Sequence, residues 1–204
     1  GLYLMFPSRF VDGRTPNPAW DYNGINDAVL KSSRDGKCFD RTFKEAWVRP
    51  GADPDQWHER SVYIMRGILD TASNELSMYM SDHWRLPSNT IRRLSLRKDG
   101  FASLRAGYTV GEVVTRTLVC AGGQLSLNVS TSAVGSVRVE VQDPDGRPLT
   151  GLGLDDCVEI FADEIDRSVR WSDDSALAAV VGQPVRLRFV LCDADLYTFH
   201  FKGD

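Results

Sequence analysis

Alternating apolar and polar residues dominate the second half of the chain. Residues 125–130 and residues 137–142 each place an apolar side chain at every second position. Because successive side chains of a strand point to opposite faces, each run predicts a strand with one buried face. The two predicted strands flank residues 133–135. Residues 185–191 and 197–201 show the same alternation and predict two further strands.

The first half is expected to consist of short strands separated by loops rich in Gly, Pro, Asn and Asp. Helical periodicity is scarce, and only residues 53–60 and 174–180 could form a turn or two of helix. The strands predicted in this half cover residues 3–6, 28–32, 62–68, 75–81 and 91–97.

Asp-Gly pairs mark predicted turns. Asp35-Gly36 lies within residues 33–39, and Asp99-Gly100 follows the predicted strand 91–97. Since Asp-Gly favours tight hairpin turns, the two pairs hint at a repeated β-meander unit, as in propeller blades. Residues 143–146, with sequence Asp-Pro-Asp-Gly, have the chemistry of a type I turn.

These patterns together predict an all-β protein in two domains. Residues 1–108 are expected to form a partial β-propeller-like meander, and residues 109–204 an antiparallel β-sandwich. The number of short strands in the second part fits a sandwich better than a helical fold.

Composition narrows the classes of partner. The net charge is −4 and the sequence pI is about 5.4, which gives no electrostatic footprint for nucleic acid. No run reaches the roughly 20 apolar residues that span a bilayer, so no membrane association is expected. The first residues lack the features of a signal peptide, and strand-like residues directly after Gly1 leave open a missing N-terminal signal or domain.

The four cysteines are far apart and show no C-x-x-C spacing. Buried or idle thiols are the favoured interpretation, with one disulfide among Cys120, Cys157 and Cys192 as the alternative. No zinc signature, phosphate loop or nucleophile elbow occurs. We therefore expect no cofactor and no metal.

Several segments together carry a family pattern. In the first half they are residues 10–36, including Gly-Ile-Asn-Asp at 24–27 and Ser-Arg-Asp-Gly at 33–36, followed by residues 41–46 and 49–51; in the second half they are residues 132–140, 154–157, 163–165, 185–189 and 193–196. The chain resembles the last blades and the appended β-sandwich of an uncharacterised group of five-bladed propeller proteins related to family 32 and family 43 glycoside hydrolases.

The resemblance implies a carbohydrate-active protein that is secreted or periplasmic. A five-bladed propeller takes on the order of 250 to 300 residues at about four strands per blade. Only about 108 residues precede the predicted sandwich, so at most two blades and an incomplete active site are expected. The open alternatives are a noncatalytic carbohydrate-binding module and a structural assembly domain, whose unpaired strand edges would favour a homo-oligomer.

Glycoside hydrolysis needs two carboxylates about 5 to 10 Å apart. Asp27 precedes a predicted strand and Glu75 begins another, which makes them the candidate catalytic residues. The candidate substrate-binding residues, which offer hydrogen bonds, charge or a stacking surface, are Asn26, Arg60, Asp82, His83 and Trp84.

Each candidate also has a structural interpretation. Asp27 and Asp82 are expected to cap loops if they are not functional, and Asp35 is expected to be a turn residue. Burial is the default for aromatic residues, although any of Trp20, Tyr22, Trp47, Trp57, Tyr63 and Trp84 could stack on a sugar. The acidic residues between positions 155 and 166 are interpreted as a solvated edge, with a bound cation as the alternative.

Overall fold

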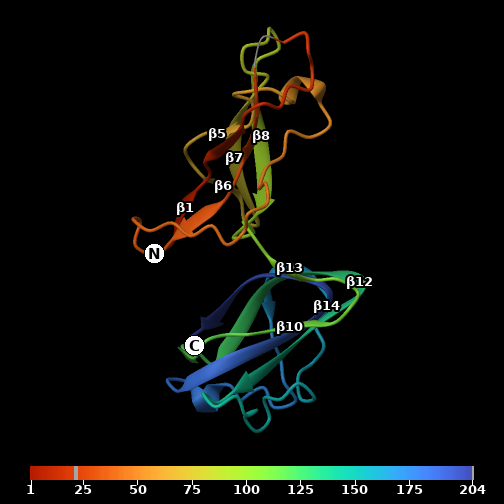
Figure 1. The fold of residues 1–204 in the computed structure, drawn as a ribbon. Coiled ribbons are helices and arrows are strands. Elements are labelled where there is room, and N and C mark those ends of the chain that lie inside the picture. The colour runs from red at the N-terminus through yellow and green to blue at the C-terminus, as the bar shows by residue number, and fades with distance from the viewer. Residues whose placement is uncertain (21–22, 204) are drawn as a thin grey trace. The chain divides into compact units, whose positions relative to one another are not determined.

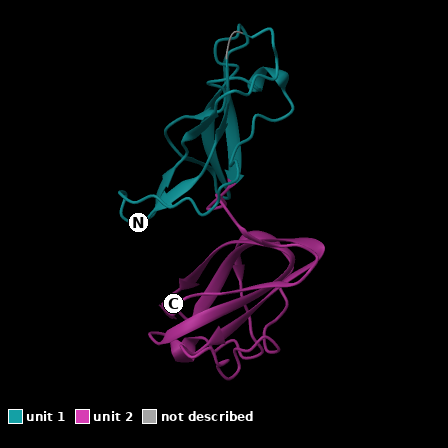
Figure 2. Cartoon of the chain, viewed as in Figure 1, with its two compact units in different colours: residues 1–96 teal, residues 97–204 magenta. Residues whose placement is uncertain are grey.

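The structure, a computed structural model, describes residues 1–20 and 23–203 (Figure 1). The chain divides into two compact units, Gly1–Leu96 (unit 1) and Arg97–Asp204 (unit 2) (Figure 2). The division falls twelve residues before position 108, where the sequence pattern placed it. Strand β9 (Leu104–Ala106) pairs with β14 (Pro184–Lys202), which attaches this segment to unit 2. The described residues are all-β and contain no α-helix.

Two antiparallel strand pairs open unit 1. β1 (Tyr3–Met5) pairs with β4 (Lys31–Ser33), and β2 (Ser8–Val11) pairs with β3 (Ile25–Ala28). The strand predicted over 28–32 is therefore divided in two. The break follows Ala28, whose N–H donates a hydrogen bond to the Val48 carbonyl at 3.0 Å.

The second sheet of unit 1 is built on β7 (Glu75–Asp82). β5 (Tyr63–Ile64) and β6 (Leu69–Ala72) pair with successive parts of β7, and β8 (Thr90–Arg97) also pairs with β7. Of the predicted strand over 62–68, only Tyr63–Ile64 is a strand.

The core of unit 1 is small. Val62, Met80 and Ala28 are almost fully buried, and Ile64 and Leu94 pack against them. This cluster joins the β7 sheet to β3, so it holds the two halves of unit 1 together.

The predicted helical segments are shorter than expected. Only 3₁₀ turns form, η1 at Pro54–Gln56 and η2 at Ala178–Val180. The Asp53 carboxylate caps η1 by accepting a hydrogen bond from the Asp55 N–H at 3.0 Å. No helix among the described residues is long and apolar enough to cross a membrane.

Unit 2 is organised around two long strands. β12 (Gln124–Gln142) and β14 pair along most of their length, with β13 (Asp163–Ser168) beside β12 and β10 (Gly111–Val114) and β11 (Leu118–Val119) beside β14. Separate strands at 125–130 and 137–142 were therefore a wrong prediction, as were separate strands at 185–191 and 197–201. Alternation alone cannot tell an irregularity inside one strand from a connection between two.

The irregularity lies between Thr131 and Ser136, where the register with β14 shifts. A Cβ atom on Gly135 would lie 2.3 Å from the Asp193 carbonyl oxygen. Opposite it, Asp193 has φ 42°. Only glycine allows this close approach of the two backbones.

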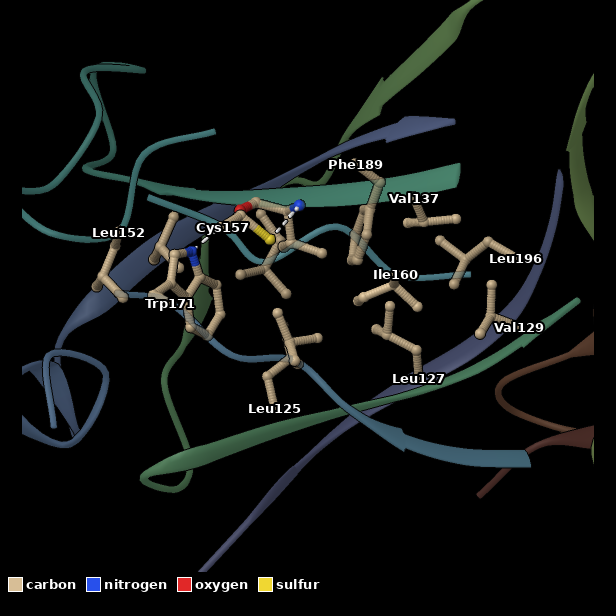
Figure 3. Close-up of a cluster of buried hydrophobic side chains, with 14 of the residues drawn as sticks. Leu125, Leu127, Val129, Val137, Leu152, Cys157, Ile160, Trp171, Phe189 and Leu196 are labelled. Atoms are coloured by element: carbon tan, nitrogen blue, oxygen red, sulfur yellow. Dashed lines mark hydrogen bonds between the residues drawn. The ribbon is translucent and has the colours of Figure 1, made fainter. Parts of the chain in front are cut away.

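A continuous apolar core fills unit 2 (Figure 3). Side chains at alternate positions of β12 and β14 point into it, as the sequence pattern predicts. The Trp171 Nε1–H donates to the Val139 carbonyl at 3.1 Å, and the Val139 N–H donates to the Cys157 sulfur at 3.2 Å. Burial raises the pKa of the Cys157 thiol. All four cysteines are free thiols.

The predicted turns are present. The Gly146 N–H donates to the Asp143 carbonyl at 3.0 Å, and the Gly100 N–H donates to the Arg97 carbonyl at 3.0 Å. Asp35 accepts hydrogen bonds from the N–H groups of Lys37 and Cys38, each at 2.8 Å. Asp35 is thus a turn residue, as expected.

Candidate functional site

Asp27 lies on β3 directly opposite Arg9 on β2. The Arg9 Nε–H donates to Asp27 Oδ1 at 2.9 Å, and a second guanidinium nitrogen bonds Oδ2. This two-point contact raises the pKa of Arg9. Asp27 therefore already has a cationic partner.

The neighbouring Asn26 is buried and joins separate segments of unit 1. Its amide nitrogen donates to Ser8 Oγ at 2.5 Å, and its amide oxygen accepts the Arg60 N–H at 2.7 Å. Asn26 thus fixes the backbone at Arg60.

Next to this network lies a cavity of about 740 Å³, called here the arginine cavity. Three arginines, two carboxylates and one tryptophan contribute to its wall. The lining residues are Arg9, Val11, Arg14, Ile25, Asn26, Asp27, Glu45, Ala46, Arg49, Pro50, Gly51 and Trp57.

Two strained loops lie next to one another at the end of the β5–β7 ladder. Arg60 and Val62 precede β5, and His83 and Arg85 follow β7; all four have positive φ, between 51° and 71°. The Tyr63–Ser81 pairing brings the loops together. Such backbone conformations are costly for residues other than glycine, above all for a β-branched residue such as Val62, and tend to occur at functional sites.

Side-chain contacts hold these loops in place. The Arg85 guanidinium pairs with Glu59 at 3.1 Å, and His83 Nε2 lies 2.8 Å from Asp53 Oδ2. The His83 hydrogen bond lowers the pKa of Asp53. The loops are therefore tied both to each other and to the segment around η1.

The two loops border a second hollow of about 400 Å³, called here the aromatic hollow and lined by Arg60, Tyr63, Ile64, Met65, Ser81 and Trp84. Trp84 is 44% exposed and Tyr63 is 43% exposed. Two of the predicted substrate-binding residues, Arg60 and Trp84, are thus brought together.

Asp82 and Glu75 line neither of the two hollows. Asp82 is buried and forms an ion pair with Arg92. Glu75 forms an ion pair with Arg93 and accepts a hydrogen bond from Thr71 Oγ1 at 3.1 Å.

Glu75 and Asp82 are at opposite ends of β7, roughly 23 Å apart at about 3.3 Å per residue. The structure therefore does not bring these two carboxylates together, and Asp27 lines a cavity to which neither contributes.

The other aromatic residues divide into two groups. Trp47 packs against Phe6 with ring centroids 4.6 Å apart, and Trp20 meets His58 edge-on at 5.3 Å. Trp57 is 40% exposed in the wall of the arginine cavity. Tyr22 lies outside the described residues.

Sequence reasoning did not single out Arg9, Arg14, Glu45 or Arg49 as site residues. A strand register that places Arg9 opposite Asp27 would have found the first. No local signal marks the other three, which reach the cavity from loops.

The acidic segment of unit 2 engages basic side chains. Asp163 pairs with Arg97 at 2.6 Å and Glu159 with Arg138 at 3.0 Å. In the described part of the chain, no cluster of three His, Cys, Asp or Glu residues is placed to hold a metal ion.

Searches of protein-family models, of curated proteins and of solved structures found no match to this chain.

Proposed function

We propose that the chain is a noncatalytic carbohydrate-binding module and that the aromatic hollow of unit 1 holds the sugar. The observation that carries the proposal is that Tyr63, Trp84 and Arg60 line one hollow. An exposed aromatic ring offers a flat apolar surface to a sugar ring, and a guanidinium offers several donors to its hydroxyl groups.

The strained loops support a binding role for the same hollow. Arg60 and Val62 on one side, and His83 and Arg85 on the other, hold costly backbone conformations. Because ion pairs and hydrogen bonds fix these loops before any ligand arrives, little ordering would remain to oppose binding.

Binding is favoured over catalysis by the placement of the carboxylates. Asp27, Glu75 and Asp82 each have an arginine partner. A glycosidase needs two carboxyl groups within about 10 Å, whereas Glu75 and Asp82 occupy opposite ends of one strand.

Glycoside hydrolysis is the second candidate function. One observation favours it: Asp27 and Glu45 line the same cavity. Release of nitrophenol from aryl glycosides, abolished in Asp27→Asn and Glu45→Gln, would support it. Equal residual activity in both variants and in the unmodified chain would reject it.

We infer that the β5–β8 sheet is a propeller-like blade and that unit 2 is a β-sandwich. The register shifts in β12 and β14 support the second inference, because the halves of each strand pair with different neighbours. A crystal structure with β12 in one flat sheet would contradict it.

The binding proposal is tested by titrating neutral oligosaccharides into the full chain and following tryptophan fluorescence and heat. We expect binding that is lost in Trp84→Ala and weakened in Tyr63→Ala. Trp57→Ala is the matched control, since Trp57 is similarly exposed but lines the other cavity. Failure of every neutral sugar to bind, or equal loss in the control, would reject the proposal.

A further inference from the structure

We propose that the arginine cavity is a second binding site, which takes an organic oxyanion through Arg14 and Arg49. The site is separate from the aromatic hollow, and the proposal does not depend on sugar binding there.

Arg9 lines the cavity, but its guanidinium nitrogens already have partners within the chain. Its Nε and one terminal nitrogen bond Asp27, and the other terminal nitrogen donates to the Lys44 carbonyl at 3.1 Å. The positive charge of Arg9 also balances the negative charge of Asp27. The Arg9–Asp27 pair is therefore a fixed, neutral part of the wall.

Arg14 and Arg49 are different. Within the described part of the chain, neither guanidinium has a hydrogen-bond or ion-pair partner, although each backbone is held. The Arg14 carbonyl accepts the Gly24 N–H at 3.2 Å, and Val48, next to Arg49, pairs with Ala28. Each guanidinium carries five N–H donors in a planar fork. Two forks on anchored backbones thus offer their donors to the cavity.

The local charge favours an anion. Unit 1 has 13 Lys and Arg against 12 Asp and Glu, a net charge of +1, although the whole chain has −4. With the charges of Arg9 and Asp27 balanced, the described lining residues that carry charge are Arg14, Arg49 and Glu45. Carboxylate, sulfate and phosphate groups match a guanidinium fork with two parallel hydrogen bonds.

The size of the cavity indicates that the oxyanion belongs to a larger molecule. Its volume of about 740 Å³ is in the range of sites for small organic ligands. The Trp57 ring forms part of the wall, and its Nε1–H is already used by the Gly51 carbonyl at 2.7 Å. The ring therefore offers an apolar surface beside the arginines.

The test is calorimetric titration of the full chain at low salt. The probes are trigalacturonate, a sulfated disaccharide, glucose 6-phosphate, inorganic phosphate and neutral maltotriose. We expect at least one organic anion to bind, and the one that does identifies the source of the oxyanion. Arg14→Gln and Arg49→Gln should each weaken it about tenfold, a loss of about 1.4 kcal/mol, because each removes a charged hydrogen-bond donor.

Three controls sharpen the result. Arg49→Lys keeps the charge but not the fork and should lose part of the affinity. Arg66→Gln, an exposed arginine outside both hollows, should change nothing. Trp84→Ala should leave anion binding intact, so a failure of sugar binding in the aromatic hollow remains distinguishable.

The proposal is overturned if no organic anion binds, if inorganic phosphate alone binds, or if maltotriose binds as tightly as the anions. Anion binding that survives both glutamine variants also overturns it. Since Arg14 and Arg49 are exposed, the variants are expected to fold, and unchanged thermal unfolding checks this.

Discussion

Arg9 and Asp27 face each other across the β2–β3 pair, and the Arg9 guanidinium bonds both carboxylate oxygens of Asp27. The contact adds to the backbone pairing of two short strands, which Asn26 also supports through its hydrogen bonds to Ser8 and to the Arg60 backbone. We therefore expect this ion pair to stabilise unit 1 whether or not a ligand binds.

Asp27→Asn is expected to lower the free energy of unfolding of unit 1 by about 1 to 2 kcal/mol, because it breaks a half-buried two-point ion pair. Urea unfolding followed by tryptophan fluorescence measures this, since four of the five tryptophans are in unit 1. Glu45→Gln, which removes an exposed carboxylate from the same cavity, is the control and should cost little. An equally small loss of unfolding free energy in Asp27→Asn and Glu45→Gln would show that the ion pair contributes nothing to stability.

Backbone strain at Arg60 can be measured by comparing two truncations. Arg60→Gly and Arg60→Ala both remove the side chain, but only glycine adopts φ 62° without cost. We expect the glycine variant to be more stable by about 1 kcal/mol. The same pair of changes at Arg66, which has no positive φ, should favour alanine, and the same preference at both positions would argue against strain at Arg60.

Asp35 gives a prediction about pH. Hydrogen bonds from Lys37, Cys38 and Ser33 lower its pKa to about 2. A carboxyl group with a depressed pKa stabilises the fold above its unfolded pKa, near 3.9, and loses that contribution as pH falls toward 2. NMR titration of the Asp35 carboxyl carbon should give the low value directly, and Asp35→Asn should flatten the acid dependence of unit 1 stability. A midpoint near 4 would contradict the turn geometry.

Gly135 is expected to tolerate no side chain. Gly135→Ala places a methyl group against the Asp193 carbonyl and should destabilise unit 2 by about 1 to 3 kcal/mol. Gly107→Ala is the matched control, because nothing lies within 4 Å of the added atom. The Trp171 indole N–H resonance, followed by NMR during unfolding, reports unit 2, since Trp171 is the tryptophan of that unit.

Self-association also remains a prediction. β8 pairs with β7 in the described residues, and Ile91 on β8 is 61% exposed. An unpaired strand edge with an exposed apolar side chain can pair with another chain. Sedimentation should show association that rises with concentration and falls in Ile91→Lys, and a monomer at every concentration would count against it.

Local sequence patterns foretold the β class, the buried faces of β12 and β14 and the turns at Asp35 and Asp143. They failed where the outcome depends on partners distant in sequence. The alternation that ends near Ser130 and resumes at Val137 predicts two strands, because periodicity carries no information on the close approach of Gly135 to the Asp193 backbone.

The candidate sites also depend on contacts between residues that are distant in sequence. Trp84 and Arg60 could be proposed from residue type, but their convergence depends on the β5–β7 register. The arginine cavity gathers residues from positions 9 to 57. The positive φ of Val62 is imposed by tertiary packing, since a β-branched residue has no intrinsic preference for it.

The register shift between Thr131 and Ser136 in the β12–β14 pairing has a kinetic consequence. The hydrogen bonds on its two sides are supported by different neighbours, β13 beside the first half of β12 and β10 beside the first half of β14. The two stretches can therefore open separately, and amide hydrogens on either side of Gly135 should exchange with solvent deuterium at different rates.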